Sequence, residues 1–372
     1  MSFFSVNTHA LEGWINQFAD EIEQANKKEK IPGYAFAIVK PNSDVTMVTH
    51  GVTHKQGKAI DKNTLFRLAS VSKTFTSVLT SKLVEQGQLD WNLPLQHMVP
   101  DVRFDKNITL EHILSQSSGF MPNAYDNLIE ANYSVERVLR QLAKLDPICA
   151  PGKCYTYQNT LFAAIDKGLN IQTNKNYKTL VQEQLFNPLD MGRASVGLKP
   201  LVEDDNWARP HAKVRNGKYI QTRVKQAYYR YASASGINAS IDDMSKWVKL
   251  MLGHYPNVLS ESQIEQLIEP KTQTTKELHR RHWLGHLKTA HYGLGWRVYD
   301  FEGKQLIHHG GWVSGYRADI TFAPEYGVGL VFLMNAESNL INKFRVDFWD
   351  HTFKTVAKKE QQQQGIVTAA LP

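Results

Sequence analysis

The spacing of apolar residues along the chain predicts which segments form helices and which form strands. Near the amino terminus, five apolar side chains recur at helical spacing: Leu11, Trp14, Ile15, Phe18 and Ile22. Two strand-like segments follow, 34–41 and 45–52, and the polar turn between them is typical of an antiparallel hairpin. A helix is expected next over 72–85, because apolar residues occupy one face and Gly87 follows as a stop signal.

The middle of the chain differs in pattern from both ends. Residues 88–230 contain helical stretches separated by Pro, Gly and Asn turns, with few strand-like runs. Further on, Ser240 and Asp243 form a capping box that starts a helix, and residues 345–356 are expected to form a last amphipathic helix. Between these helices lie four short strand candidates at the spacing of an antiparallel meander. They are residues 295–301, 305–309, 316–323 and 327–335.

Strands at both ends of the chain around a helical middle predict an α+β fold. We expect an antiparallel sheet of the five-stranded type, flanked by helices and built from residues 1–78 and 232–357. A mostly helical domain, residues 79–231, interrupts this sheet domain, and residues 358–372 form a polar tail. The cleft between the two parts is the expected functional site.

Composition and charge exclude several classes of protein. Hydrophobic residues make up 42% of the 372 residues, which is typical of globular chains and not of disordered or collagen-like ones. No apolar run approaches the roughly 18 residues of a membrane span, so no transmembrane segment is expected. The excess of 43 Lys and Arg over 36 Asp and Glu is mild and scattered, and the densest basic stretch, 279–288, is interpreted as a surface loop. We therefore expect no nucleic-acid partner.

Cofactor and metal motifs are missing from the sequence. Neither a phosphate-binding Walker loop nor a dinucleotide fingerprint occurs, so no cofactor is expected. His279, His282 and His286 have loose metal-like spacing but lack a neighbouring carboxylate or thiolate, so no metal site is expected. The first 26 residues lack the basic and apolar regions of a secretory leader, which indicates the cytoplasm if Met1 is the natural start.

One serine and one lysine have the spacing of a nucleophile and its base. Ser70 and Lys73 form the single S-x-x-K pattern of the chain, at the start of the helix expected over 72–85. One helical turn places both on nearly the same face, and the partial positive charge of the helix start disfavours an ammonium and favours an alkoxide. Lys73 can therefore serve as a base. The alternative is a helix-capping serine with a solvated lysine.

A tyrosine is followed two residues later by an asparagine at two places. The pairs are Tyr125 with Asn127 and Tyr157 with Asn159. We favour the second pair, because it follows a Pro-Gly turn and has no acid between its members to disturb a phenol that must ionise. The alternative is a half-buried aromatic residue beside a turn-forming asparagine.

Paired glycines follow directly on the second strand of the expected meander, in the segment His309-Gly310-Gly311-Trp312. Such glycines weaken a strand, which indicates that a ligand or another backbone approaches closely. Backbone N–H groups beside a ligand can polarise a carbonyl, as an oxyanion hole does. A Ser-His-Asp triad that uses His309 stays open, whereas the lack of a G-x-S-x-G elbow argues against an α/β-hydrolase.

Together these pieces resemble the serine β-lactamase-like family, which includes class C β-lactamases, low-molecular-weight penicillin-binding proteins and esterases. The resemblance covers most of the chain. The motifs that carry it are FRLASVSKTF at 66–75, LSQSSG at 114–119, a Pro-Gly turn leading into YQN at 157–159, YGLGW at 292–296 and HGG at 309–311.

The resemblance implies a role for each residue of these motifs. Ser70 would be the acylated nucleophile, while Lys73 and Tyr157 would share proton transfers and depress one another's pKa. Asn159 would contact both the substrate and Lys73. The backbone N–H groups of Ser70 and Trp312 would form the oxyanion hole.

Position 309 departs from the class C pattern, which has a lysine there. His309, Gly310, Gly311 and Trp312 would form the substrate-binding strand, with His309 binding a substrate carboxylate only as an imidazolium. Arg317 is an alternative source of positive charge, or else a solvated surface residue.

The resemblance also implies an activity. We expect a serine hydrolase that forms an acyl-enzyme on amides of the β-lactam or D-alanyl peptide type. A carboxylesterase and a non-catalytic penicillin-binding-like protein are the alternatives. The partner would be a small-molecule or peptide substrate, and a monomer is expected.

Two cysteines bracket the Pro-Gly turn before Tyr157. The resemblance favours the periplasm or cell envelope for this chain, and with it a bond between Cys149 and Cys154, whereas a reducing cytoplasm would leave two free thiols.

Overall fold

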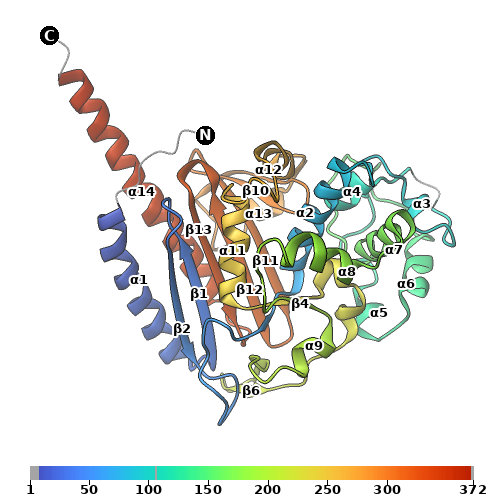
Figure 1. The fold of residues 1–372 in the computed structure, drawn as a ribbon, viewed down its shortest axis with the longest axis horizontal. Helices are drawn as coiled ribbons and strands as arrows, with labels where there is room; N and C mark the ends of the chain where they lie inside the picture. Colours follow the sequence, from blue (N-terminus) through green and yellow to red (C-terminus); the bar gives the residue numbers. More distant parts are fainter. Residues whose placement is uncertain (1–7, 105–106, 370–372) are drawn as a thin grey trace.

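A wide antiparallel sheet lies at the centre of the computed structural model, which describes residues 8–104 and 107–369 (Figure 1). Eight strands form it, in the order β2-β1-β13-β12-β11-β10-β9-β8. In that order the strands are β2 (Val45–Gly51), β1 (Gly33–Val39), β13 (Val328–Met334), β12 (Tyr316–Ala323), β11 (Lys304–Val313), β10 (Arg297–Phe301), β9 (Leu287–Tyr292) and β8 (Thr272–Gln273). The α+β class and the antiparallel sheet are confirmed, and the sheet is wider than the five-stranded type.

Alternation along the strands gives the sheet two apolar faces. In β1, the side chains of Tyr34, Phe36 and Ile38 join one core cluster, and those of Ala35 and Ala37 join another. This is the period of two that a strand buried on both faces requires.

Helices from the two ends of the chain cover one of these faces (Figure 1). They are α1 (Thr8–Glu29) and α14 (Leu340–Ala369). Phe18 of α1 lies between Phe36 of β1 and Phe344 of α14, with ring centroids 6.1 Å and 6.0 Å away. The last helix thus runs well beyond the expected 345–356 and includes most of the expected polar tail.

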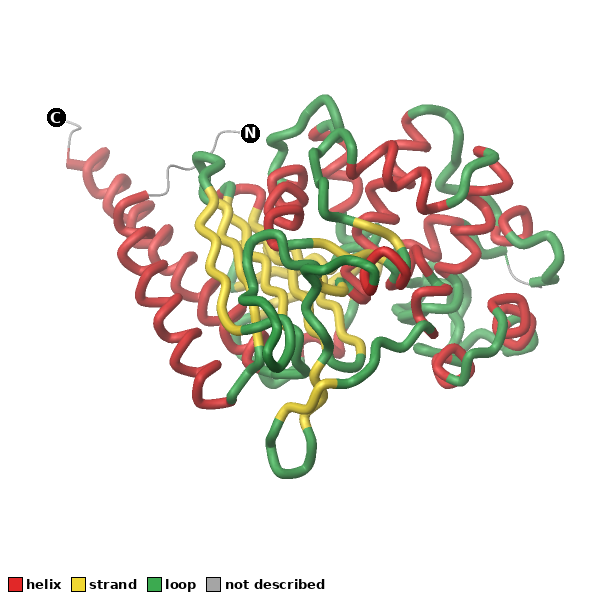
Figure 2. The backbone as a smooth tube through the Cα atoms, turned by 60° about the horizontal axis from the view of Figure 1, so that its bottom comes forward, coloured by secondary structure: helices red, strands yellow, loops and turns green. Residues whose placement is uncertain are grey.

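The opposite face of the sheet packs against α11 (Ile241–Met251) and α2 (Ser72–Glu85), both at their expected positions. The ring of Trp247 stacks on that of Phe75 at 3.8 Å, which joins these two helices. Figure 2 shows the shorter helices gathered beyond them. These are α3 (Leu95–Met98), α4 (Leu110–Leu114), α5 (Asp126–Glu130), α6 (Val135–Leu142), α7 (Phe162–Thr173), α8 (Tyr177–Val181), a π-helix (Gln182–Phe186), α9 (Leu198–Val202), α10 (Ala232–Ser235), α12 (Glu261–Ile268) and α13 (Thr275–Leu278).

Short elements complete the fold. A three-stranded sheet joins β3 (Phe66–Arg67), β7 (Ile237–Ala239) and β4 (Ser195–Val196), and a small hairpin pairs β5 (His211–Lys213) with β6 (Tyr219–Gln221). The 3₁₀ turns are η1 (Ala69–Val71), η3 (Ala227–Arg230) and η4 (Pro324–Tyr326). The boundaries proposed for the helical domain, 79–231, remain a prediction.

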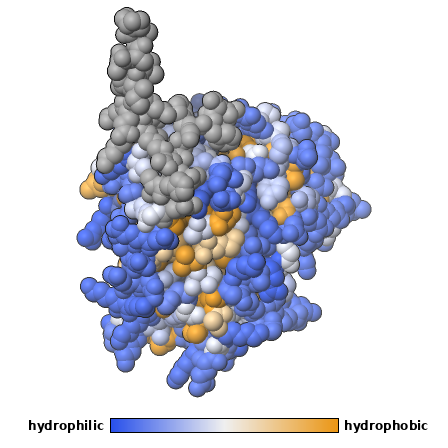
Figure 3. Space-filling model, turned by 60° about the vertical axis from the view of Figure 1, so that its left-hand side comes forward, coloured by the Kyte–Doolittle hydropathy of each residue, from blue (hydrophilic) through white to orange (hydrophobic). Residues whose placement is uncertain are grey.

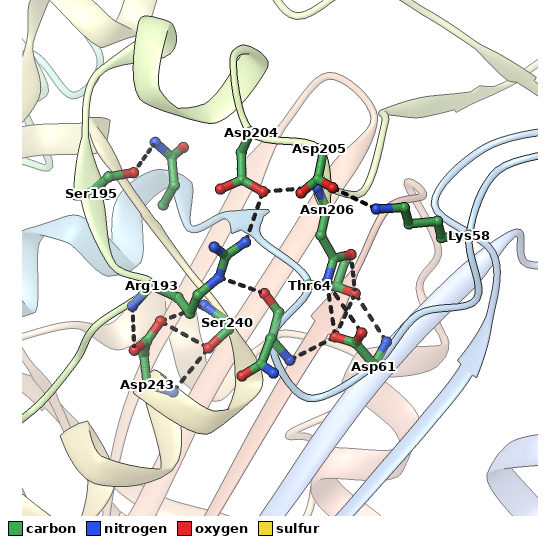
Figure 4. Close-up of polar contacts among 12 residues, drawn as sticks. Lys58, Asp61, Thr64, Arg193, Ser195, Asp204, Asp205, Asn206, Ser240 and Asp243 are labelled. Atoms are coloured by element: carbon green, nitrogen blue, oxygen red, sulfur yellow. Dashed lines mark hydrogen bonds and ion pairs between the residues drawn. The ribbon is translucent and has the colours of Figure 1, made fainter.

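A polar network holds the segment that leads into β3 (Figure 4). The Asp61 carboxylate accepts hydrogen bonds from Thr64 Oγ1 at 3.2 Å and from Asn206 Nδ2 at 3.0 Å. Nearby, Arg193 pairs with Asp204 at 2.7 Å. Because β3 is followed directly by the turn that carries Ser70, this network fixes the approach to the expected nucleophile.

β2 forms one edge of the sheet. The face of the molecule shown in Figure 3 is mostly hydrophilic, with apolar side chains gathered through its middle. All seven residues of β2 are half-buried, as expected for an edge strand. Among the residues that the structure describes, no helix combines the length and the apolar character needed to cross a membrane.

Candidate active site

A pocket of about 980 Å³ lies where the helical part meets β10 and β11. Its lining includes Ser70, Tyr157, Asn159, Gly310 and Trp312, five residues singled out from the sequence. The structure therefore brings three motifs that are far apart in the chain to one place.

Ser70 lies in the tight turn η1, directly before α2. The preceding residue, Ala69, has a φ of 49°, a left-handed conformation that is uncommon for a residue with a side chain. On the other side of this turn, β11 approaches so closely that a Cβ on Gly311 would lie 2.1 Å from the Leu68 carbonyl oxygen. The close approach expected at the paired glycines is thus made by another backbone.

Lys73 is fully buried one helical turn after Ser70. Its Nζ lies 2.7 Å from Asn159 Oδ1, 3.1 Å from the Ala234 carbonyl oxygen and 3.4 Å from Ser70 Oγ. The first two atoms only accept hydrogen bonds, so they take the two N–H groups of a neutral amine. The lone pair of that amine is then left for the proton of the Ser70 hydroxyl.

Burial also brings Lys73 towards the neutral state. Desolvation lowers its pKa from 10.5 to about 7, because an ammonium loses its hydration there. The Asp126 carboxylate opposes this shift, and the Arg297 guanidinium adds to it. A large fraction of Lys73 is therefore an uncharged amine at neutral pH.

The pKa of Tyr157 moves in the opposite direction from the one expected. Burial raises it to about 12, and the nearby Ser70 hydroxyl offsets only part of this effect. The idea that Lys73 and Tyr157 depress one another's pKa was wrong: burial, not Tyr157, lowers the pKa of Lys73, and burial raises that of Tyr157 because it penalises a phenolate as it penalises an ammonium. Tyr157 is a neutral phenol at pH 7.

The LSQSSG segment holds Tyr157 and its neighbours in place. The backbone oxygen of Gln116 accepts a hydrogen bond from Thr156 N at 2.7 Å, and its side-chain oxygen accepts one from Gln158 N at 2.6 Å. Asn123 N donates to the backbone carbonyl oxygen of Tyr157 at 2.8 Å. These bonds fix the backbone on both sides of the phenol.

Cys149 and Cys154 form a disulfide across the turn that precedes Tyr157, as favoured from the sequence, with Cα atoms 6.3 Å apart. Cys154 and Gly152 line the pocket, and Gly152 N donates to the Ser117 oxygen at 2.8 Å. The disulfide therefore braces one wall of the pocket.

We expect the double variant Cys149→Ser, Cys154→Ser to lose roughly 2 kcal/mol of unfolding free energy, the entropy of closing so short a loop. Guanidinium unfolding followed by fluorescence measures the loss. Reduced wild type is the control and should show the same midpoint as the variant. A variant midpoint equal to that of oxidised wild type would show that the bond adds no stability.

His309 occupies a different place from the one expected. Its side chain is fully buried, does not line the pocket, and bonds through Nε2 to the Tyr292 hydroxyl at 2.9 Å. Burial and the nearby Arg297 hold its pKa well below 6.5, so no imidazolium is available for a substrate carboxylate. Arg317 does not line the pocket either, and it lies over the ring of Trp312 at 5.1 Å.

The charged residues that line the pocket were missed in the sequence, and Arg297 and Asp126 are two of them. Arg297, directly after the YGLGW motif, lines the pocket and pairs with Glu277 at 2.8 Å. Asp126 also lines it and accepts a hydrogen bond from Asn159 Nδ2 at 2.9 Å. Asp126 lies between Tyr125 and Asn127, the tyrosine-asparagine pair that was not chosen from the sequence. The residue of that segment that reaches the pocket is therefore the acid between the pair.

One group of possible metal ligands occurs within residues 8–104 and 107–369. It consists of His286, Glu302 and Asp350, and includes neither His279 nor His282. Lys354 already pairs with Asp350 at 2.7 Å, and none of the three ligands lines the pocket.

Comparison with known proteins agrees with this architecture. The model of the family described as Beta-lactamase matches residues 18–345. A β-lactamase from Escherichia coli is 24% identical over 377 residues, covering 92% of this chain and 94% of that protein. An unguisins hydrolase from Aspergillus campestris is 24% identical over 341 residues, covering 86% of this chain, and the chain spans 61% of that hydrolase's length.

A solved structure shows the same fold. The octameric penicillin-binding protein homologue from Pyrococcus abyssi superposes with a TM-score of 0.77 at 21% identity, over 87% of this chain and 74% of that one. Because the family model covers most of the sequence, the chain belongs to the β-lactamase family.

Proposed function

We propose that this protein is a serine hydrolase that acts through an acyl-enzyme on Ser70. The observation that carries the proposal is the buried Lys73, whose Nζ lies within hydrogen-bond distance of two carbonyl oxygens and of Ser70 Oγ. As Ser70 attacks a carbonyl carbon, neutral Lys73 accepts the hydroxyl proton. Tyr157, a neutral phenol close to Ser70, gives its proton to the leaving group and regains one from the Lys73 ammonium, so both groups return to their neutral forms. Water then attacks the serine ester and gives a proton to Lys73, which returns it to Ser70 Oγ as the acid is released.

The backbone of β11 supports an oxyanion hole at this serine. Pairing between β10 and β11 ends at Arg297 and His308, whereas pairing with β12 continues to Val313. Along 309–313, β11 therefore has no strand partner on the β10 side, as far as the described residues extend. We assign the N–H groups of Ser70 and Trp312 to the developing oxyanion.

The charge of the pocket favours anionic substrates. Seven Lys and Arg side chains line it, against four Asp and Glu side chains. Arg297 lies among them, with the rings of Tyr155, Tyr157 and Tyr292 within 6 Å of its guanidinium. It replaces His309 as the group that would bind a substrate carboxylate. β-Lactams and D-alanyl peptides carry such a carboxylate near the amide bond, so they are the proposed substrate class.

Mass spectrometry tests the acyl-enzyme. Incubation with benzylpenicillin or a fluorophosphonate should place one adduct on Ser70 and none on the Ser70→Ala variant. Labelling of both proteins to the same extent would overturn the proposal. Absence of any adduct on wild type would favour a non-catalytic binding protein.

Turnover assays separate the remaining alternatives. A chromogenic cephalosporin, a D-Ala-D-Ala peptide and a short-chain nitrophenyl ester should be compared side by side. Turnover of the neutral ester alone would make the protein a carboxylesterase instead. Light scattering should accompany these assays to measure the oligomeric state, because the homologue from Pyrococcus abyssi is an octamer and does not support the expected monomer.

A further inference from the structure

We infer that Asp126 is a positioning residue of the active site, which orients the Asn159 amide and thereby keeps the lone pair of Lys73 directed at Ser70. The inference rests on the proposed function for its kinetic consequences. Its structural basis is a chain of hydrogen bonds from α5 through Asn159 to Lys73 on α2.

The orientation of an asparagine amide is set by its partners, because its two ends are nearly equal in size and opposite in hydrogen-bonding role. Asn159 Oδ1 accepts from Lys73 Nζ at 2.7 Å, and Asn159 Nδ2 donates to Asp126 Oδ2 at 2.9 Å. An ionised carboxylate can only accept, so it selects the orientation in which Nδ2 faces α5. A flipped amide would place Oδ1 against the Asp126 carboxylate, where two acceptors repel, and Nδ2 against Lys73 Nζ.

A flipped amide would also change what Lys73 does with its own hydrogens. Its remaining fixed acceptor would be the Ala234 oxygen at 3.1 Å, so one N–H would turn to Ser70 Oγ. The lone pair would then point away from the hydroxyl that must lose its proton. Correct orientation of Asn159 is thus part of the basicity of Lys73 towards Ser70.

The charge of Asp126 acts on the same lysine. Of the charged groups around Lys73, the Asp126 carboxylate raises its pKa, whereas Arg297 on β10 lowers it. Lys73 also lies 5.0 Å from the ring of Tyr157, and its charge lowers the pKa of His309 on β11. Removal of the carboxylate therefore lowers the pKa of Lys73.

Asp126 itself is kept ionised at neutral pH by a balance of groups. Burial raises its pKa to about 6, and Glu130 on the same helix adds to the rise. The hydrogen bond from Asn159, the charge of Lys73 and the hydroxyl of Tyr228 on η3 oppose it. Above about pH 6 the carboxylate form predominates, so its effect is present in the range where Lys73 titrates.

Two variants separate orientation from charge. Asp126→Ala removes both and should slow acylation of Ser70 about 10²-fold, the scale of a misplaced catalytic group, with KM changed less than threefold. Asp126→Asn keeps the shape of the side chain and one acceptor oxygen, but the new amide and that of Asn159 can then flip together. It should therefore slow acylation less, about tenfold. Asn127→Ala, at the next and exposed position of α5, is the matched control and should keep the wild-type rate.

A readout without turnover completes the test. Carbon-13 NMR of labelled lysines, with Lys73 assigned by its loss in Lys73→Arg, should show the Lys73 titration midpoint about one pH unit lower in Asp126→Asn than in wild type. The inference would be overturned if both Asp126 variants kept the wild-type Lys73 midpoint and acylated Ser70 at a rate within twofold of wild type. If wild type never labels at Ser70 but Asp126→Asn still lowers the Lys73 midpoint, the coupling between Asp126 and Lys73 is supported and the proposed function is overturned.

Discussion

Replacement of Lys73 by methionine is expected to slow acylation of Ser70 by about 10²- to 10⁴-fold, the usual contribution of a general base. Methionine fills a similar volume but has no basic nitrogen, so the Ser70 hydroxyl keeps its place in η1 but has no group to take its proton. The rate of adduct formation with a fluorophosphonate, followed by mass spectrometry, measures the loss. The fold should persist, because a buried amine is replaced by an apolar side chain.

The same lysine sets the pH dependence of wild type. Its pKa is lowered to about 7, and only the neutral amine acts as a base, so acylation should rise with pH through about 7 and level off above it. Tyr157, with a pKa of about 12, stays protonated over this range and should add no second rise. Lys73→Arg is the control for charge, since a guanidinium does not deprotonate. An acidic limb that survives in Lys73→Met would assign it to another group.

Motif residues of the site were predictable because their spacing reflects local geometry. One helical turn separates Ser70 from Lys73, and the paired glycines mark the close approach between β11 and the Leu68 backbone. Arg297 and Asp126 were not predictable in this way. Each reaches the pocket through tertiary packing, and a charged residue on a strand or a short helix carries no sign of the face that it will occupy.

The fold was predictable to a similar degree. Strongly apolar strands such as β1, β12 and β13 lie within one or two residues of their expected bounds. β9 was missed because three of its six residues are polar, and two of its positions are exposed near the edge of the sheet. The burial of His309 was also hidden from the sequence, since the Tyr292 hydroxyl that accommodates it comes from that same missed strand.

A methyl group added at Gly311 should be almost as damaging as loss of the base. The Cβ of Gly311→Ala would lie 2.1 Å from the Leu68 carbonyl oxygen and 3.2 Å from Ala69 Cβ. The first of these atoms belongs to the backbone and cannot rotate away, so β11 must move outward from η1. That movement separates the N–H of Trp312 from Ser70, and loss of one oxyanion donor costs about 10²- to 10³-fold in acylation.

Two further alanine variants define what the Gly311 result means. Gly192→Ala has no heavy atom within 4 Å of its new Cβ and should retain the wild-type rate and melting temperature. Gly310→Ala, the neighbouring position on β11, meets the Asp319 carboxylate at 3.4 Å, an ordinary contact, and should lose less than tenfold. If Gly311→Ala acylates as fast as Gly310→Ala while remaining folded, then β11 does not supply the oxyanion donor. If it labels slowly but binds benzylpenicillin reversibly as wild type does, the loss lies in the transition state, as an oxyanion hole requires.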